Sequence, residues 1–295
     1  MSSADVAVKI FRTLEPEDFK TLRAVEIQMK KSEFISQELI SRHAKLLSEE
    51  VVYRLDELSK HGLLQHQSTP YVGYRLTAAG YDCLAINALV KANVLQAFGR
   101  SLGVGKESDV YDALMPDNTR VAVKFHRLGR ISFSQTKRKR GYVAEQAYTP
   151  TWLYQARLAA QKEFEALNIL YPKGVSVPKP IKQNRHVIVM SIIEGAELYY
   201  LEILNPRKVL DEILLNIKKA YKDAGIIHAD LSSYNIIVQL DEHILIIDWP
   251  QYVTVKHPNA EQLLQRDVQN ILRFFGQKLR LETNLEDVLA NIRGN

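Results

Sequence analysis

The stretch IIHADLSSYNIIVQLDEHILIIDWPQY, residues 226–252, decides the fold. Asp230 and Asn235 stand five residues apart on a polar segment that leads into the apolar run IIV, a pattern that predicts a loop entering a strand. A turn at residues 241–242 separates this strand from a second apolar run, HILII, which Asp248 follows. The sequence therefore predicts two strands around a turn, with a carboxylate and a carboxamide on one rigid turn before them and a second carboxylate after them.

Upstream, the segment GVGKES, residues 103–108, predicts a turn between two strands. A Gly-x-Gly turn lets backbone N–H groups approach phosphate oxygens closely. It is not a Walker phosphate loop, because no Gly-Lys-Ser/Thr follows at the right spacing and no helix starts there. A second turn at residues 116–118 leads to the strand VAVK, which ends at Lys124. A lysine at the end of such a strand matches the one that pairs with nucleotide phosphates in kinases.

The helix expected from Thr151 carries a charged side chain on its apolar face. Positions 156, 160, 163, 167 and 170 share one face, and all but one are Ala or Leu. Glu163 interrupts this buried stripe, whereas Glu165 is expected to face water. A carboxylate on an apolar face needs a cation, and Lys124 is the candidate.

These pieces follow one another in the order of a protein-kinase active site: glycine turn, lysine, glutamate, His-x-Asp-x4-Asn and a final aspartate. In that pattern Asp230 is the catalytic carboxylate, and Asn235 and Asp248 bind a metal ion. Asp248 lies 13 residues beyond Asn235, where the magnesium-binding aspartate of kinases stands. His228 is expected to hold the loop.

The first 90 residues predict helices followed by a hairpin and another helix. Ser36 and Ser48 are expected to cap two helices, and Gly62 is expected to end the second. The segment LLQHQSTPYVGYRLT, residues 63–77, predicts two short strands around a turn, after which Thr77 caps a helix. Helix, helix and two-stranded wing is the winged-helix order.

The charge of the second of these helices, over residues 48–60, disfavours sequence-specific DNA binding. Between residues 48 and 60 it holds four Asp and Glu against two Lys and Arg, so it would repel a phosphate backbone. Its residues Val51, Leu55 and Leu58 predict one apolar face. Docking to a protein or to a folded RNA is therefore favoured over docking to DNA.

Composition and charge narrow the class of protein. The 295 residues are 46% hydrophobic and 25% charged, which is enough to bury a hydrophobic core without stabilising disulfide bonds or metal ions. The single cysteine, Cys83, excludes an internal disulfide framework. No apolar run is long enough to span a bilayer, and the early acids near the N-terminus do not fit a signal peptide, so a cytoplasmic protein with no membrane contact is expected. Residues 91–175 hold 14 Lys and Arg against 7 Asp and Glu, which indicates contact with phosphate.

Three further elements are predicted from periodicity. Residues 186–193 form an apolar strand, and residues 207–224 and 260–279 form helices. The basic stretch 127–150 is expected to be poorly ordered, and its Ser and Thr residues are candidate autophosphorylation acceptors.

Taken together, the sequence resembles the RIO atypical protein kinases, in the second branch, whose members have an N-terminal winged helix. The segments GKESDVY (105–111), RISFSQTKRKR (130–140), HADLSSYN (228–235), IDWPQ (247–251) and HPNA (257–260) carry the resemblance. The resemblance implies an α+β, two-lobed kinase-like fold, with a winged-helix domain over 1–90, an N-lobe over 91–194 and a reduced C-lobe over 195–295. It implies ATP and Mg²⁺ as cofactors and a role in maturation of the small ribosomal subunit, with ribosomal RNA and proteins as partners. The short C-terminus resembles the archaeal members, which have no eukaryotic tail.

The resemblance also implies roles in nucleotide binding. Lys106 and Ser108 would contact the phosphates, and Lys124, held by Glu163, would pair with the α- and β-phosphates. The other residues implied around the nucleotide are Gly103, Gly105 and Val110 at the glycine turn, Met190 as gatekeeper, and Ser191 and Ile193 as backbone partners of adenine.

For the reaction itself, the resemblance implies that Asp230 is the catalytic base or positioning residue. Asn235 and Asp248 would bind Mg²⁺, and Asp248 is also implied as a phosphate acceptor, which would give an ATPase-like cycle. Trp249 and Ser191 differ from the residues that are usual at these positions in this branch. Neither difference is expected to abolish ATP binding.

Two alternatives stay open. The first is a small-molecule phosphotransferase of the aminoglycoside-kinase type, which shares the His-x-Asp-x4-Asn loop. The second is an ATP-gated ribosome assembly factor whose catalysis is incidental. A conventional peptide kinase is not expected, because Asp248-Trp249-Pro250 replaces Asp-Phe-Gly, no Ala-Pro-Glu follows, and few residues remain for peptide-docking helices.

Overall fold

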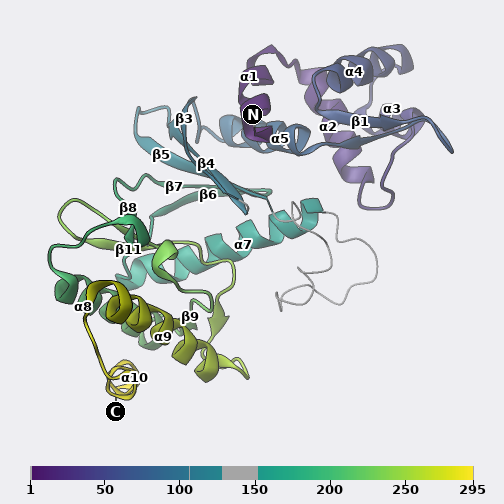
Figure 1. Cartoon of the computed structure of the whole chain (residues 1–295). Helices are drawn as coiled ribbons and strands as arrows, with labels where there is room; N and C mark the ends of the chain where they lie inside the picture. Colours follow the sequence, from purple (N-terminus) through teal and green to yellow (C-terminus); the bar gives the residue numbers. More distant parts are fainter. Residues whose placement is uncertain (1, 106, 128–151, 295) are drawn as a thin grey trace. The chain divides into compact units, whose positions relative to one another are not determined.

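The structure is a computed structural model that describes residues 2–105, 107–127 and 152–294 (Figure 1). Contacts divide the chain into two compact units. The first comprises Met1–Arg157 with Asn184–Val187, and the second comprises Leu158–Gln183 with Ile188–Asn295. No helix within the described ranges has both the length and the apolar character that a bilayer crossing needs.

The first unit begins with the predicted winged-helix order. Helices α3 and α4 are followed by the antiparallel pair β1–β2, the wing, and then by α5. Two helices that the sequence analysis did not resolve precede them, and α1 packs on α5 while α2 packs on α3. The bounds are α1 Ser3–Ile10, α2 Pro16–Gln28, α3 Gln37–Ala44, α4 Ser48–Lys60, β1 Leu64–Gln67, β2 Gly73–Leu76 and α5 Ala78–Lys91.

Local sequence signals predicted two of these helix ends correctly and a third incorrectly. The Thr77 hydroxyl accepts a hydrogen bond from the Gly80 amide at 3.2 Å, so the predicted cap of α5 is confirmed. Gly62 follows α4 with a φ of 70°, a left-handed conformation that glycine adopts without strain. The prediction that Ser48 caps α4 is wrong, because Leu47 occupies the cap position and Ser48 is the first helical residue.

Three antiparallel strands follow, as the turns in the sequence predict: β3 Ala97–Val104, β4 Ser108–Leu114 and β5 Arg120–His126. The Gly105 amide donates to the Ser108 carbonyl oxygen at 2.8 Å and closes the turn between β3 and β4. Along β4 the buried residues Asp109, Tyr111 and Ala113 alternate with half-buried ones, the pattern of a strand with one face in a core.

The buried face of β4 contacts the winged helix. The Tyr111 hydroxyl donates to the Asp5 carboxylate of α1 at 2.7 Å. Arg127, directly after β5, pairs at 2.7 Å with both Asp82 of α5 and Asp109 of β4, and all three side chains are buried. A network of charges thus joins α5 to the strands within the first unit.

Arg127 was predicted to begin a basic, poorly ordered stretch. In the structure its guanidinium is instead buried between the carboxylates of Asp82 and Asp109. The rest of that stretch, residues 128–150, lies outside the described residues, as do its candidate phosphorylation sites.

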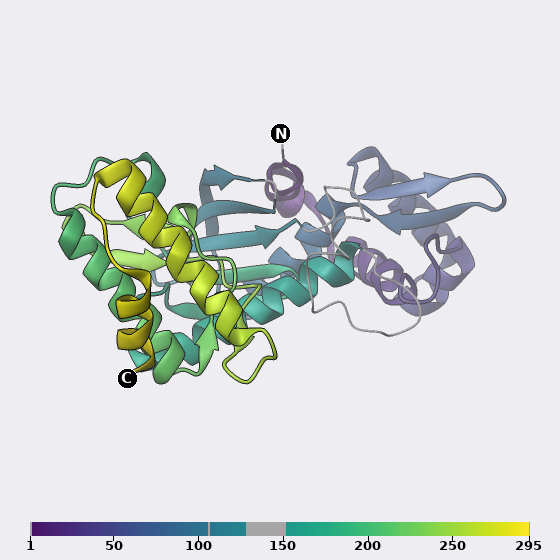
Figure 2. The same cartoon turned by 60° about the horizontal axis from the view of Figure 1, so that its bottom comes forward.

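The second unit contains the predicted hairpin. Strands β10 and β11 are antiparallel and pair in the order β11-β10-β8, while β12 pairs with β9. Helices α8 and α9 contact each other, and α10 packs on both (Figures 1 and 2). After α7 the bounds are β6 Pro180–Asn184, β7 Val187–Ser191, β8 Ala196–Glu197, α8 Pro206–Lys222, β9 Ile226–Ile227, β10 Ile236–Val238, β11 Ile244–Ile246, β12 Val253–Thr254, α9 Ala260–Leu279 and α10 Leu285–Arg293. The last residue of β6 and the first of β7 belong to the first unit.

The long helix α7, Trp152–Leu170, links the units, since residues up to 157 belong to the first and later ones to the second. The predicted apolar face is confirmed, with Ala156, Ala160 and Leu167 buried. Glu165 is exposed as expected.

Candidate active site

The loop before β10 and the residue after β11 form the candidate catalytic segment of the second unit. Asp230 is exposed, whereas Asn235 and Asp248 are half-buried. The Asn235 side-chain nitrogen donates to the Asp230 carbonyl oxygen at 2.9 Å. The Asn235 carbonyl oxygen accepts from the Ile247 amide at 2.9 Å. Asn235 therefore connects the loop that carries Asp230 to the strand end that carries Asp248.

His228 has the structural role that the sequence predicted. Its Nε2 atom lies 3.0 Å from the Ile247 carbonyl oxygen, and its ring lies 4.5 Å from the buried Trp249 ring. The Trp249 indole in turn donates to the Ile246 carbonyl oxygen at 3.1 Å. These contacts fix the backbone on both sides of Asp248.

Asp267 of α9 is a residue that the sequence analysis missed. Its carboxylate accepts from the Ala229 amide at 2.6 Å and from the Leu231 amide at 3.1 Å, the two residues that flank Asp230. Asn270, one turn further along α9, donates to the Leu231 carbonyl oxygen at 3.1 Å. Burial raises the pKa of Asp267 to about 7, against the two amide donors, which lower it.

A signal for Asp267 was present in the sequence. It lies on α9 between Leu264 and Ile271, at the spacing that buries both. A carboxylate within an apolar stripe is the same pattern that singled out Glu163.

The backbone is strained at two positions beside these groups. Ala229 has a φ of 63° and Asp248 a φ of 67°, in the left-handed region that residues with a Cβ rarely occupy. Such conformations persist where surrounding bonds over-determine them, and they gather at functional sites. Here the bonds from Asp267 hold Ala229.

The first unit supplies the predicted phosphate-binding residues. Lys124 of β5 lies opposite Val110 of β4 in the strand register, and only 5% of its surface is exposed. Ser108 precedes Val110 by two residues and so lies on the same face of β4. Gly103 and Gly105 are exposed at the end of β3. Lys106 lies outside the described residues.

The remaining predicted nucleotide contacts belong to the second unit. Glu163 of α7 is 2% exposed, which agrees with a carboxylate turned into the interior. Met190 is buried at the end of β7, and Ser191 and Ile193 are half-buried. The Ser191 amide donates to the Lys179 carbonyl oxygen at 2.9 Å. Because Lys124 and Glu163 lie in different units, their pairing stays a prediction.

The donor set fits a magnesium ion. Mg²⁺ prefers oxygen ligands and takes them from one or two carboxylates together with substrate phosphates. Asp248 offers a carboxylate. Since the Asn235 side-chain nitrogen donates to the Asp230 carbonyl oxygen, the amide oxygen is the atom of this side chain that would bind a metal ion. Within the described ranges no three His, Cys, Asp or Glu side chains gather as a metal cage.

The fold and the hydrogen-bonded loop define a protein-kinase-like phosphotransferase, and comparison with known proteins gives its family. Residues 109–288 match the RIO domain, and residues 11–92 match the N-terminal domain of Rio2. The chain belongs to the RIO-type serine/threonine-protein kinases, in the Rio2 branch.

Individual relatives agree with this assignment. The chain is 42% identical over 266 residues to the RIO-type serine/threonine-protein kinase Rio2 of Methanocaldococcus jannaschii, covering 88% of this chain and 96% of that protein. It is 41% identical to the kinase rio2 of Dictyostelium discoideum over 92% of its own length, but it spans only 52% of that relative. The crystal structure of the Rio2 kinase-ADP/Mg²⁺-phosphoaspartate complex from Chaetomium thermophilum matches with a TM-score of 0.82 at 34% identity, over 95% of this chain and 87% of that one. The expected kinase-like fold with an N-terminal winged-helix domain is therefore confirmed.

Proposed function

We propose that the chain transfers the γ-phosphoryl group of ATP in the presence of Mg²⁺, with Asp230, Asn235 and Asp248 at the reacting centre. The observation that carries this proposal is the frame of hydrogen bonds around Asp230, in which Asp267 holds both neighbours and Asn235 holds the Asp230 carbonyl. Such a frame keeps a catalytic group in place before substrate arrives, which is the main contribution of a protein to phosphoryl transfer.

Each residue has a distinct role in the proposal. Asp230, exposed on its loop, accepts a hydrogen bond from an attacking water molecule or hydroxyl group and orients it. Asn235 and Asp248 hold Mg²⁺, which neutralises charge on the phosphates. Lys124 pairs with the α- and β-phosphates, and Glu163 orients Lys124.

We further propose that Asp248 itself accepts the phosphoryl group. A carboxylate oxygen of Asp248 bonds to the γ-phosphorus as the bond from that phosphorus to the bridging oxygen of ADP breaks, and water then hydrolyses the acyl phosphate to carboxylate and inorganic phosphate. The solved relative from Chaetomium thermophilum is a phosphoaspartate complex by its description, which supports this cycle.

Labelled ATP tests the acceptor. The protein is incubated with ATP labelled at the γ-phosphate and quenched in acid, and half of the sample is treated with hydroxylamine, which cleaves acyl phosphates but not phosphoserine or phosphothreonine. We expect hydroxylamine to remove the bound label and Asp248→Asn to acquire none. If all label survives hydroxylamine, Asp248 is a metal ligand only.

The cellular role proposed is maturation of the small ribosomal subunit in the cytoplasm. Membership of the Rio2 branch and the winged-helix domain support it. The intact protein is recovered from extract of its own cells with and without ATP, and the RNA bound to it is sequenced. We expect precursors of the small-subunit RNA, released when ATP is present, whereas an absence of ribosomal RNA would contradict the role. If Asp230→Asn binds the particles and is released from them as the wild type is, catalysis is incidental and the chain is an ATP-gated assembly factor.

A further inference from the structure

The winged-helix domain has a groove between helix α4 and the wing, β1–β2, which we name the α4–wing groove. The residues that matter for its chemistry are Val52, Tyr53, Asp56 and Lys60 of α4 and His66 and Tyr74 of the wing. All belong to the first unit, so the groove is complete within it.

Apolar side chains lie open on the helix side of the groove. Val52 is 48% exposed and Tyr53 57% exposed, although Val51 and Leu55 beside them are fully buried. The buried residues already attach α4 to its core, so the core does not require Val52 and Tyr53. Exposed apolar groups that gather beside a hollow are typical of a surface that binds a partner.

The cations of this region are already held by acids. Arg54 pairs with Glu15 at 2.6 Å and Glu50 at 2.7 Å, is 13% exposed, and lies with its guanidinium carbon 5.3 Å from the centroid of the Tyr53 ring. Lys60 pairs with Asp56 at 2.6 Å and with Glu57 at 2.9 Å.

The wing offers no further cation to the groove. Its one arginine, Arg75, bonds to Glu33 and, at 2.8 Å, to Gln65. Residues 48–76 contain no other Lys or Arg and hold four acids. Lys60 is the one Lys or Arg among the residues that line the groove, and Asp56 and Glu57 neutralise its charge, so the groove is apolar and slightly acidic.

This chemistry selects the class of partner. Nucleic acids are bound chiefly through Lys and Arg contacts to phosphates, and the one such residue in this lining, Lys60, is already paired with two acids. A Lys- and Arg-rich protein segment is complementary in charge to α4, whose four acids outnumber its two cations, and its guanidinium groups can stack on the exposed Tyr53 ring as Arg54 does. We propose that the α4–wing groove binds a Lys- and Arg-rich segment of a partner protein, with Tyr53 and Asp56 as its main contacts.

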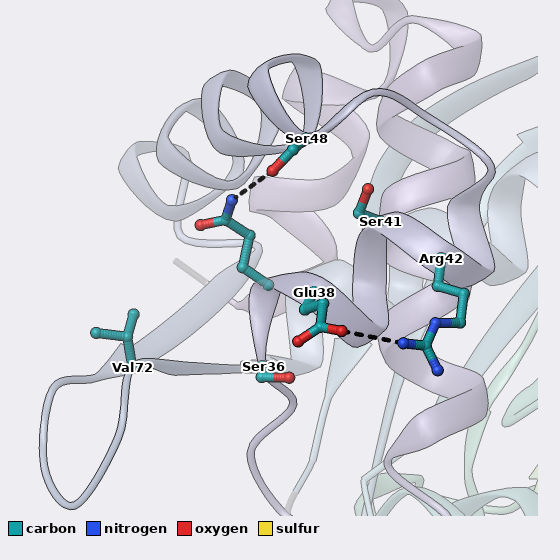
Figure 3. Close-up of a pocket in the computed structure, with 7 residues that line it drawn as sticks. Ser36, Glu38, Ser41, Arg42, Ser48 and Val72 are labelled. Carbon is teal, nitrogen blue, oxygen red and sulfur yellow. Dashed lines mark hydrogen bonds and ion pairs between the residues drawn. The ribbon is translucent and has the colours of Figure 1, made fainter.

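The neighbouring hollow at the start of α3 and α4 supplies a control. There Gln37 donates to the Ser48 hydroxyl at 3.1 Å and Glu38 pairs with Arg42 at 3.0 Å, while Val72 lies apart on the wing (Figure 3). Glu38 is an exposed helical acid of the same domain that does not line the α4–wing groove. Glu38→Lys therefore makes the same type of charge change as Asp56→Lys at a different place.

Binding of a labelled peptide tests the proposal in the full-length protein. The probe is a fluorescein-labelled peptide of Arg, Gly and Leu residues, with a Glu, Gly and Leu peptide and a labelled single-stranded RNA for comparison. We expect the Arg peptide alone to bind, and Tyr53→Ala and Asp56→Lys each to weaken it by about tenfold. Glu38→Lys should change its affinity by less than about twofold, and ATP turnover should be the same in all variants, because α4 does not take part in it.

Three results would overturn the proposal. In the first, the wild type does not bind the Arg peptide. In the second, it binds the peptide but Tyr53→Ala and Asp56→Lys leave the affinity unchanged while circular dichroism shows both folded. In the third, the wild type binds the RNA more tightly than the peptide and Asp56→Lys strengthens RNA binding, which would assign the groove to nucleic acid.

Discussion

At the scale of the residue, the position of Asp230 depends on a carboxylate on another element. Asp267 accepts hydrogen bonds from the amides on either side of Asp230, and both amides are buried with it. A buried N–H donor that loses its acceptor lowers the stability of the folded protein by about 1–3 kcal/mol, and Asp267 satisfies two such donors. Asp267 is therefore a positioning residue, since it contacts the loop and not the reacting atoms.

Asp267→Ala should lower kcat with little change in the KM for ATP, because it frees the loop that orients Asp230 without removing a nucleotide contact. It should also lower the free energy of unfolding by about 2–6 kcal/mol, which is about 1–3 kcal/mol for each of the two amides that lose their acceptor. Steady-state ATP turnover and chemical denaturation measure both. Arg273→Ala, on the exposed face of the same helix, is the matched control and should change neither. An unchanged kcat in Asp267→Ala would show that the loop needs no support from α9.

The same residue predicts a dependence of stability on pH. Burial raises the pKa of Asp267 from 3.8 to about 7, so between these values the folded chain binds a proton that the unfolded chain releases. The contribution of this group to stability is fully present below 3.8 and is lost as the pH rises through about 7. The unfolding free energy of the wild type minus that of Asp267→Asn should therefore fall from about pH 4 to about pH 8. A difference that grows with pH would mean that the amide donors outweigh burial.

At the scale of the element, a buried charge network joins helix α5 to strands β4 and β5. Arg127 pairs with Asp82 through two bonds of 2.7 and 3.0 Å and with Asp109 through one of 2.7 Å. His186 lies 2.6 Å from the same Asp82 carboxylate, and its ring stacks at 4.5 Å on Tyr81. The winged helix and these strands should therefore unfold together.

Arg127→Met should destabilise the protein by about 3–5 kcal/mol, because it leaves two buried carboxylates without a cation. Arg120→Met, at the start of β5, is the control, since its pair with Asp112 is half-exposed and should contribute less than about 1 kcal/mol. Denaturant unfolding followed by circular dichroism gives both values. Equal losses in the two variants would show that the network adds nothing to ordinary surface pairing.

Periodicity and turn chemistry predicted the longer elements of this chain. Gly62 and Thr77 marked helix ends, and the apolar runs before Asp248 became β10 and β11. The strands β8, β9 and β12 are two residues long, too short for a pattern that needs several repeats. They form because their backbones meet partners distant in the sequence, which local preference does not encode.

The candidate site was predictable to the extent that its residues follow a motif. Asp230, Asn235 and Asp248 stand at fixed spacings, and Asn235 joins the loop of Asp230 to the strand end before Asp248, while their roles stay predictions. Asp267 was not predicted as a site residue, because it lies far along the chain from the loop that it holds. Only the packing of α9 brings its carboxylate to that loop.

At the scale of the whole molecule, the two units divide the residues of the proposed reaction between them. Strand residues such as Lys124 belong to the first unit, and the loop of Asp230 belongs to the second. The Rio2 relatives match this chain over residues of both units. Lys124 is only 5% exposed, so its replacement would also disturb the interior, whereas Asp230 is exposed and can be changed without affecting the core.

ATP turnover by the wild type and by Asp230→Asn, measured side by side with Mg²⁺, tests the central claim most directly. We predict that the wild type turns over ATP and that the variant does so about 10²–10⁴-fold more slowly, as expected when a group that orients or accepts a proton is removed. The thermal unfolding midpoint should be the same for both. Equal turnover by the two proteins, or a loss of activity that accompanies a loss of the folded state, would contradict the assignment of Asp230 to the reaction.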